Sequence, residues 1–148
     1  MANINILVGS ITGKALTAGS AIKDVFNEQA HSARLFANAG IEQVTDESVD
    51  LLVIVTSSTG QGELPPGLVP LYAQLQSEFP AIPNKKFSVV ALGDSSHSTF
   101  CQGGAMMEAL MCELQGQALC DRFNIDAIER FNPVDVARQW ALDCVKQL

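Results

Sequence analysis

The sequence predicts a single α/β domain in which a parallel sheet is covered by helices on both faces. Three apolar, β-rich runs are nearly continuous, at Ile4–Val8, Leu51–Val55 and Phe87–Leu92, as in strands that are buried on both faces. Helical patterns separate these runs along the chain, which is the order expected of βα units in a doubly wound sheet. The 148 residues contain no repeat, linker or low-complexity segment, so we expect one domain over residues 1–148.

The other elements are predicted from apolar spacing and from signals at their ends. Weaker strands are expected at Ser32–Phe36 and at Ala118–Ile125, which completes five βα units. The last helix has the clearest start, with Asn132 as its N-cap and Pro133 at its first position. Apolar residues at helical spacing would turn one face of each helix toward the sheet. The helices expected on this basis are Ala15–Gln29, Pro66–Glu78, Gly104–Leu114 and the one that begins at Pro133.

The composition excludes several classes of partner. Nine basic against sixteen acidic residues give a net charge of −7, and no basic cluster exceeds Lys85-Lys86. Because a nucleic-acid backbone binds to a positive surface, we expect no nucleic-acid partner. No stretch approaches the roughly 20 apolar residues of a membrane span, so we expect no membrane partner. The four cysteines and two histidines show neither a CxxC pair nor ligand spacing, which predicts a cytoplasmic protein with reduced thiols and no metal site.

The candidate site follows the carboxyl ends of the three strong strands, where ligands bind in doubly wound sheets. The loops at these places are GSITGKA (Gly9–Ala15), TSSTGQGELPPG (Thr56–Gly67) and GDSSHSTFCQGG (Gly93–Gly104). Each loop is rich in glycine, which permits close backbone approach, and in hydroxyl side chains, which donate hydrogen bonds without charge. Because all three loops occupy equivalent places in one sheet, they predict one ligand site rather than ordinary turns.

The first loop predicts a site for one terminal phosphate. Its glycines enclose three residues rather than the four of a Walker loop, and Ala15 follows Lys14 where that loop needs Ser or Thr for magnesium. The dinucleotide fingerprint GxGxxG is also absent after this strand. The loop can still offer a phosphate the hydroxyl groups of Ser10 and Thr12, several backbone N–H groups and a helix dipole. The side chain of Lys14 is expected to be solvated, with its backbone alone in use.

The three loops resemble those of flavodoxins, and the resemblance covers essentially the whole chain. GSITGK resembles the motif for the FMN phosphate, (S/T)-x-T-G-x-T. TSSTGQGELP resembles the loop on the inner flavin face, and ALGDSSHSTFCQGG resembles the outer loop GDSSY followed by FC. The similarity is greatest to short-chain flavodoxins of the YqcA and MioC type, which are related to the FMN domains of sulfite reductase and P450 reductase. This resemblance implies FMN as cofactor and a flavodoxin-like five-stranded parallel sheet of order 2-1-3-4-5.

The resemblance also implies a role for each loop. The first loop would wrap the phosphate, and the second would line the ribityl chain and inner flavin edge, with the Gly60 peptide near flavin N5. The third would form the outer loop, in which Cys101 is expected to pack rather than to react. No catalytic or metal-ligating residue is implied. The cofactor-binding residues expected in this way are Ser10, Ile11, Thr12, Gly13, Lys14, Ala15, Thr56, Ser57, Ser58, Thr59, Gly60, Gly93, Asp94, His97, Phe100 and Cys101.

Three positions depart from the usual flavodoxin pattern. Ala15 removes a hydroxyl that the phosphate motif normally supplies, and Thr59 stands where many flavodoxins place an aromatic residue. His97 replaces the tyrosine expected to stack on the outer flavin face, and an imidazole titrates near pH 6.5. The alternative for His97 is a loop side chain that points into solvent. The second and third loops contain Glu63 and Asp94 but neither Lys nor Arg, which predicts a low potential for forming anionic reduced flavin.

The resemblance implies an electron carrier with no enzymatic activity of its own. It would shuttle low-potential single electrons between a donor of the flavodoxin/ferredoxin–NADP reductase type and an unidentified redox acceptor protein, as a monomer. An alternative is an FMN-dependent NAD(P)H oxidoreductase of the same fold. The small Thr59 would leave room for a nicotinamide over the flavin, but no second nucleotide motif is visible. A third possibility is a non-redox interaction module that has lost the cofactor, for which Ala15 is the only hint.

Overall fold

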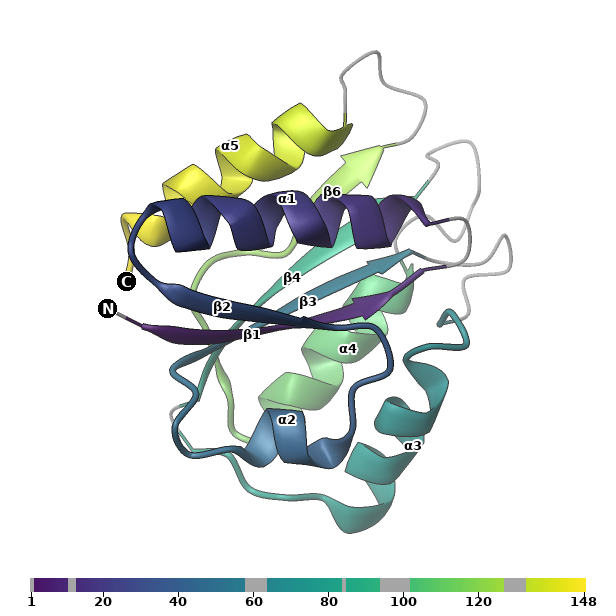
Figure 1. The fold of residues 1–148 in the computed structure, drawn as a ribbon. Helices are drawn as coiled ribbons and strands as arrows, with labels where there is room; N and C mark the ends of the chain where they lie inside the picture. The colour runs from purple at the N-terminus through teal and green to yellow at the C-terminus, as the bar shows by residue number, and fades with distance from the viewer. Residues whose placement is uncertain (1, 11–12, 58–63, 84, 94–101, 127–132) are drawn as a thin grey trace.

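The computed structural model describes residues 2–10, 13–57, 64–83, 85–93, 102–126 and 133–148. Strands and helices alternate along most of this chain (Figure 1). In chain order the elements are β1 (Asn3–Gly9), α1 (Lys14–Glu28), β2 (Ser32–Phe36), α2 (Ile41–Thr45), β3 (Leu51–Ser57), α3 (Val69–Glu78), β4 (Lys86–Gly93), α4 (Gln102–Glu113), β5 (Gln117–Ala118), β6 (Phe123–Asp126) and α5 (Pro133–Val145).

The strands form one parallel sheet of order β2-β1-β3-β4-β5, and β6 also pairs with β4. This confirms the predicted fold class and strand order. The order reverses at β1, whose two neighbours in the sheet are β2 and β3. Strands β1, β3, β4 and β6 end along one edge of the sheet, and helix α1 begins at that edge (Figure 1). A doubly wound sheet binds its ligand at such a reversal, beyond the carboxyl ends of the strands.

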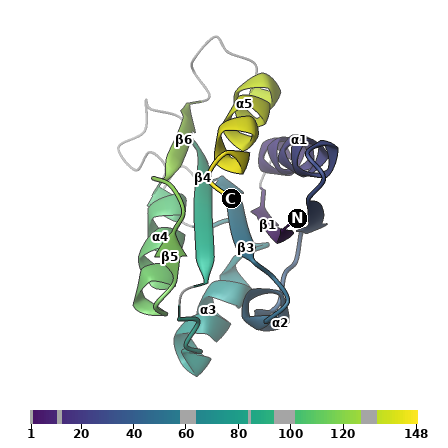
Figure 2. The same cartoon turned by 90° about the vertical axis from the view of Figure 1, so that its left-hand side faces the viewer.

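Helices cover both faces of the sheet and enclose two separate cores. Helices α1 and α5 lie over one face, and α2, α3 and α4 lie over the other (Figures 1 and 2). Successive strand residues alternate between the two cores. In β3, Val53 lies in the core beneath α1 and α5, Ile54 lies in the core beneath α2, α3 and α4, and both are fully buried. This double burial is the physical reason that the three strong strands have nearly continuous apolar sequences.

The predicted fifth strand, Ala118–Ile125, is divided into two short strands in the structure. Strand β5 pairs with Lys86 and Phe87 at the start of β4, whereas β6 pairs with the end of β4 from Val90 to Gly93. The N–H group of Leu119 still donates to the carbonyl of Phe87 at 2.8 Å before the chain leaves the ladder. The prediction of one continuous strand was therefore wrong in extent, although its position beside β4 was right.

Helix α2 was not predicted from the sequence. It spans five residues, of which only Val44 is buried, so it has no repeating apolar stripe that a periodicity search could detect. A local signal at its start is the N–H of Gly40, which donates to Oε1 of Gln43 at 2.7 Å. This is half of a capping box, since a glycine has no side chain to complete it.

Candidate functional site

The amino end of helix α1 is the first part of the candidate site. Gly13, the N-cap, has a φ of 86°, and its N–H donates to Oγ of Ser10 at 2.8 Å. The first intrahelical bond runs from the N–H of Thr17 to the carbonyl of Gly13 at 3.0 Å. The N–H groups of residues 14–16 precede that bond, and a glycine N-cap has no side chain to accept them. This helix therefore presents unsatisfied donors and the positive end of its dipole at the sheet edge.

The side chains around this helix start point in different directions. Ala15 is fully buried in the core between α1 and the sheet, so it can offer a ligand only its N–H group. Lys14 is exposed, as was expected from the sequence. Apart from its chain neighbours and the backbone of α1, no described atom lies within 4 Å of the place that a Cβ of Gly13 would occupy. The space on that side of the N-cap is therefore open among the described residues.

The carboxyl end of β3 supplies two neighbouring hydroxyl groups with different surroundings. The hydroxyl of Thr56 is buried and donates to the carbonyl of Ser57 at 2.8 Å. The hydroxyl of Ser57 is also buried but has no hydrogen-bond partner among the described residues. Strand alternation places Ser57 on the same side as Val53 and Val55, which is the face covered by α1 and α5. An unpaired buried hydroxyl therefore lies on the face of the sheet where helix α1 begins.

The register of the sheet brings the ends of the three predicted loops together. Gly9 pairs with Thr56, and Ser57 pairs with Leu92, one residue before the end of β4 at Gly93. The described site residues are therefore contributed by adjacent strands of a single edge. The other predicted residues lie outside the described part of the chain: Ile11, Thr12, Ser58, Thr59, Gly60, Asp94, His97, Phe100 and Cys101.

Two other kinds of site are absent from the described residues. Across the described ranges, no cluster of three or more His, Cys, Asp or Glu side chains could hold a metal ion. In the same part of the chain, no helix combines the length and apolar character needed to cross a membrane. The described part of the candidate site offers main-chain N–H groups and hydroxyls.

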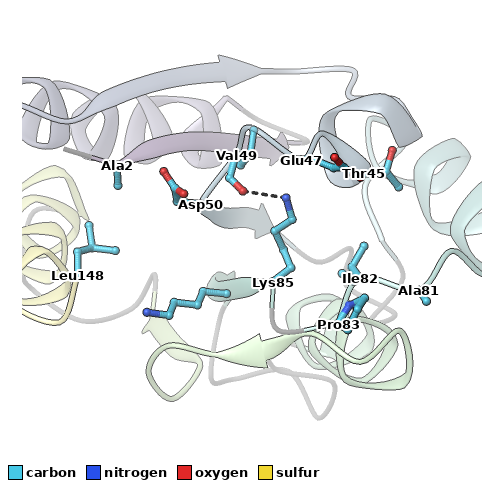
Figure 3. Close-up of a pocket in the computed structure, with 11 residues that line it drawn as sticks. Ala2, Thr45, Glu47, Val49, Asp50, Ala81, Ile82, Pro83, Lys85 and Leu148 are labelled. Atoms are coloured by element: carbon cyan, nitrogen blue, oxygen red, sulfur yellow. Dashed lines mark hydrogen bonds between the residues drawn. The ribbon is translucent and has the colours of Figure 1, made fainter.

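A cavity of about 590 Å³ lies at the opposite edge of the sheet, where the strands begin (Figure 3). Lys85 crosses it, and its Nζ donates to the carbonyl oxygens of Asp46 at 2.6 Å and Val49 at 2.8 Å. Burial lowers the pKa of Lys85, and the charges of Asp46 and its acidic neighbours oppose that shift. This lysine fastens the turn before β3 to the start of β4, a structural role that a basic pair in the sequence did not reveal.

Comparison with known proteins identifies the family of this chain and agrees with its fold. A family model described as Flavodoxin matches residues 6–140. The chain is 36% identical over 140 residues to Flavodoxin YqcA of Pectobacterium carotovorum subsp. carotovorum, covering 95% of this chain and 93% of that protein. It is 31% identical over 145 residues to a MioC homolog of Pasteurella multocida, covering 98% and 97%. A solved structure of a mutant flavodoxin from Pseudomonas aeruginosa matches with a TM-score of 0.91 and 29% identity, covering 99% and 98%. The resemblance expected from the three loops is confirmed.

Proposed function

This chain belongs to the flavodoxin family, and from that premise we propose that it carries single electrons at low potential between two redox proteins. The electron donor would be of the flavodoxin/ferredoxin–NADP reductase type, and the acceptor would be a second redox protein. Flavodoxins are electron carriers that bind FMN, and the flavin supplies the redox chemistry when bound. We propose a cytoplasmic monomer with no catalytic residue of its own. The observation that best supports this proposal is the uncapped amino end of α1 at the sheet edge where β3 ends with Ser57, whose buried hydroxyl has no partner among the described residues.

The donors at the first loop suit the terminal phosphate of FMN. The N–H groups of residues 14–16 and the dipole of α1 favour a dianion at this place. Oγ of Ser10 already accepts the N–H of Gly13, which leaves the proton of its hydroxyl free to be donated to a phosphate oxygen. The exposed Lys14 adds a positive charge nearby, but backbone groups form the core of this proposed phosphate site.

The two hydroxyls at the end of β3 would act in different ways. Thr56 uses its hydroxyl to hold the carbonyl of Ser57, so it fixes the peptide rather than donating to a ligand. The hydroxyl of Ser57 has no partner among the described residues, and we propose that it bonds a polar atom of the cofactor directly. The resemblance assigns Ser58, Thr59 and Gly60 to the inner flavin edge and the segment from Asp94 to Cys101 to its outer side, and these assignments remain part of the proposal.

Replacing Ser57 with alanine is expected to weaken FMN binding without lowering the stability of the FMN-free protein. The substitution removes a buried hydroxyl that has no described partner, so the FMN-free protein should keep or slightly increase its free energy of unfolding. FMN should bind about 3- to 10-fold more weakly, the range expected for one neutral hydrogen bond. Urea unfolding without FMN and fluorescence titration with FMN measure the two quantities.

Ser88→Ala is the matched control, because Ser88 is also a buried strand serine but its hydroxyl lies 3.3 Å from Sγ of Cys120. It should lower stability and leave FMN affinity unchanged. Equal effects of the two substitutions on FMN affinity would contradict a direct role for the hydroxyl of Ser57.

The pH dependence of the redox potential is expected to become shallower in His97→Phe. A protonated imidazole beside the flavin favours the anionic reduced form, so the wild-type potential should rise as pH falls through about 6.5. At about 4 Å and with full water screening, such a charge contributes about 1 kcal/mol. Potentiometric titration from pH 5 to 8 tests this, with His31→Gln as control, because His31 accepts the N–H of Ala2 near the start of β1. Equal slopes in wild type and His97→Phe would refute the stacking role.

The proposed function is tested by measuring which partners deliver electrons to the protein and which accept them. FMN-loaded protein should reduce cytochrome c only when NADPH and a reductase of the flavodoxin type are both present. Potentiometric titration should resolve two one-electron steps. Rapid bleaching of the flavin by NADPH alone would instead support the alternative, an FMN-dependent NAD(P)H oxidoreductase. A purified protein that is colourless and takes up no FMN would support a non-redox interaction module.

A further inference from the structure

Gly9 is the last residue of β1 and the first residue of the predicted phosphate loop. It is buried, and it pairs in the sheet with Thr56, the residue at which the second predicted loop begins. Pro65, near the other end of that loop, and Leu68, directly after it, lie close to the same glycine. A Cβ at position 9 would be 2.6 Å from Cγ of Leu68 and 2.8 Å from Cγ of Pro65. Both ends of the second loop therefore adjoin Gly9.

The turn from Pro65 to Leu68 is held in place from several sides. The N–H of Leu68 donates to the carbonyl of Pro65 at 3.0 Å, and Leu68 is also the N-cap of α3. The side chain of Leu68 is fully buried in the core beneath α2, α3 and α4. A Cβ at Gly67 would lie 3.0 Å from the carbonyl oxygen of Ala37, so this turn also lies close to the chain that follows β2. A side chain at position 9 would consequently meet atoms that cannot easily move.

The backbone of Gly9 does not itself require glycine. Its φ is not positive, in contrast to that of Gly13, so other residues could adopt the same conformation. Glycine weakens a strand, and it marks places where other groups approach the backbone closely. The close approach of Pro65 and Leu68 is therefore the reason for a glycine at the end of an otherwise apolar strand.

We propose that Gly9 is a positioning residue for the flavin ring, because its missing side chain lets Pro65 and Leu68 pack against the end of β1. The packing fixes the separation between the two ends of the second loop. This inference rests on the proposed function, in which the second loop lines the ribityl chain and the inner flavin edge. A binding site needs its supporting residues held to within about 0.5 Å. Gly9 acts through its two neighbours and needs no contact with the flavin.

Gly9→Ala should weaken the binding of FMN and of riboflavin by the same factor, about 5-fold or more, which is the lower end of the range for overpacking. The added methyl group displaces Pro65 and Leu68, and the binding of either flavin has to restore their position. Both ligands contain the ring and the ribityl chain, so the phosphate does not change this cost. Fluorescence titration of the FMN-free protein gives both dissociation constants. The visible circular dichroism of FMN at saturation should also differ from that in wild type.

Gly116→Ala is the matched control for a purely structural effect. A Cβ at Gly116 would lie 3.0 Å from the carbonyl oxygen of Met111 and 3.1 Å from Cδ1 of Phe87, so this substitution also overpacks a close contact. Gly116 directly precedes β5, which pairs with the start of β4 at the opposite edge of the sheet. This variant should unfold at a lower urea concentration than wild type. It should keep both flavin affinities within about 2-fold of wild type and leave the visible circular dichroism unchanged.

Leu68→Ala tests whether relief of the contact restores binding, since it removes the atoms nearest to position 9. Alone, it leaves a gap beside Gly9 and should weaken the binding of both flavins. Combined with Gly9→Ala, it provides space for the new methyl group, so the double variant should bind both flavins more tightly than the product of the two single losses predicts. If Gly9→Ala alone does not fold, the double variant should still fold and match the affinities of Leu68→Ala within about 3-fold.

Three outcomes would overturn the role of Gly9. The first is an unchanged affinity of folded Gly9→Ala for both flavins, and the second is a loss confined to FMN, which would mean that residue 9 acts through the phosphate. The third is a double variant that binds more weakly than the two single losses predict. The proposed function fails separately, if wild type binds no FMN. If wild type binds FMN and Gly9→Ala binds it equally well, only the inference about Gly9 fails.

Discussion

Gly13→Asp is expected to weaken FMN binding by roughly 30-fold or more while the protein stays folded. The carboxylate would stand at the N-cap of α1, where the doubly charged phosphate of FMN is proposed to bind, and a unit charge about 4 Å from a dianion is repelled by about 2 to 8 kcal/mol. Any side chain at the Gly13 φ of 86° is strained by about 1–2 kcal/mol, although aspartate adopts a positive φ more readily than most residues. A negative charge at a helix amino end offsets part of this cost by about 0.3–1 kcal/mol. Without FMN, the variant should therefore stay folded, with a free energy of unfolding within about 2 kcal/mol of wild type.

Gly13→Asn is the control that isolates charge from shape. Asparagine has nearly the size of aspartate and the same tolerance for a positive φ, but it carries no charge. Its FMN affinity should stay within about 5-fold of wild type, because the uncharged amide does not repel the phosphate. The difference between the two variants should shrink as salt is added. Equal affinities of the two variants at low ionic strength would show that the phosphate does not bind at this helix end.

Gly104→Ala is expected to lower the free energy of unfolding by about 1–3 kcal/mol, the usual range for overpacking. A Cβ at position 104 would lie 2.4 Å from Cβ of Ala91, and neither atom can move without a shift of α4 or of strand β4. Helix propensity alone would favour alanine by about 1 kcal/mol, so the sign of the result decides which effect prevails. The measurement is urea unfolding of the FMN-free protein.

Ser20→Ala is a suitable control for that measurement, because Ser20 is exposed on α1 and the substitution should change stability by no more than about 0.5 kcal/mol. If Gly104→Ala were as stable as wild type or more so, the close approach of α4 to β4 would not be a feature of the protein in solution.

The central strands were predictable because their sequences reflect burial on two faces. Ile4–Val8 and Leu51–Val55 are apolar at nearly every position, since alternate residues enter different cores. The division of the fifth strand was not predictable, because β5 and β6 contribute only two and four paired residues and their register does not appear in an apolar pattern. Helix α2 escaped prediction for a related reason, since its single buried side chain, Val44, creates no periodicity.

The sequence predicted a candidate site at the carboxyl ends of three strands, but it did not distinguish the roles of the individual side chains there. Thr56 and Ser57 are adjacent hydroxyl residues, and only the structure distinguishes the bonded hydroxyl from the free one. Ala15 appeared as a loss of a phosphate ligand, whereas the structure shows a methyl group that fills the core.

The most direct test of the account compares FMN with riboflavin in a fluorescence titration of the FMN-free protein. The two ligands share the flavin ring and ribityl chain and differ in the terminal phosphate, which is proposed to bind the N–H groups at the start of α1. We expect saturable quenching of FMN fluorescence at one molecule per chain and much weaker binding of riboflavin. An absence of saturable quenching by FMN, or equal affinity for the two flavins, would contradict it.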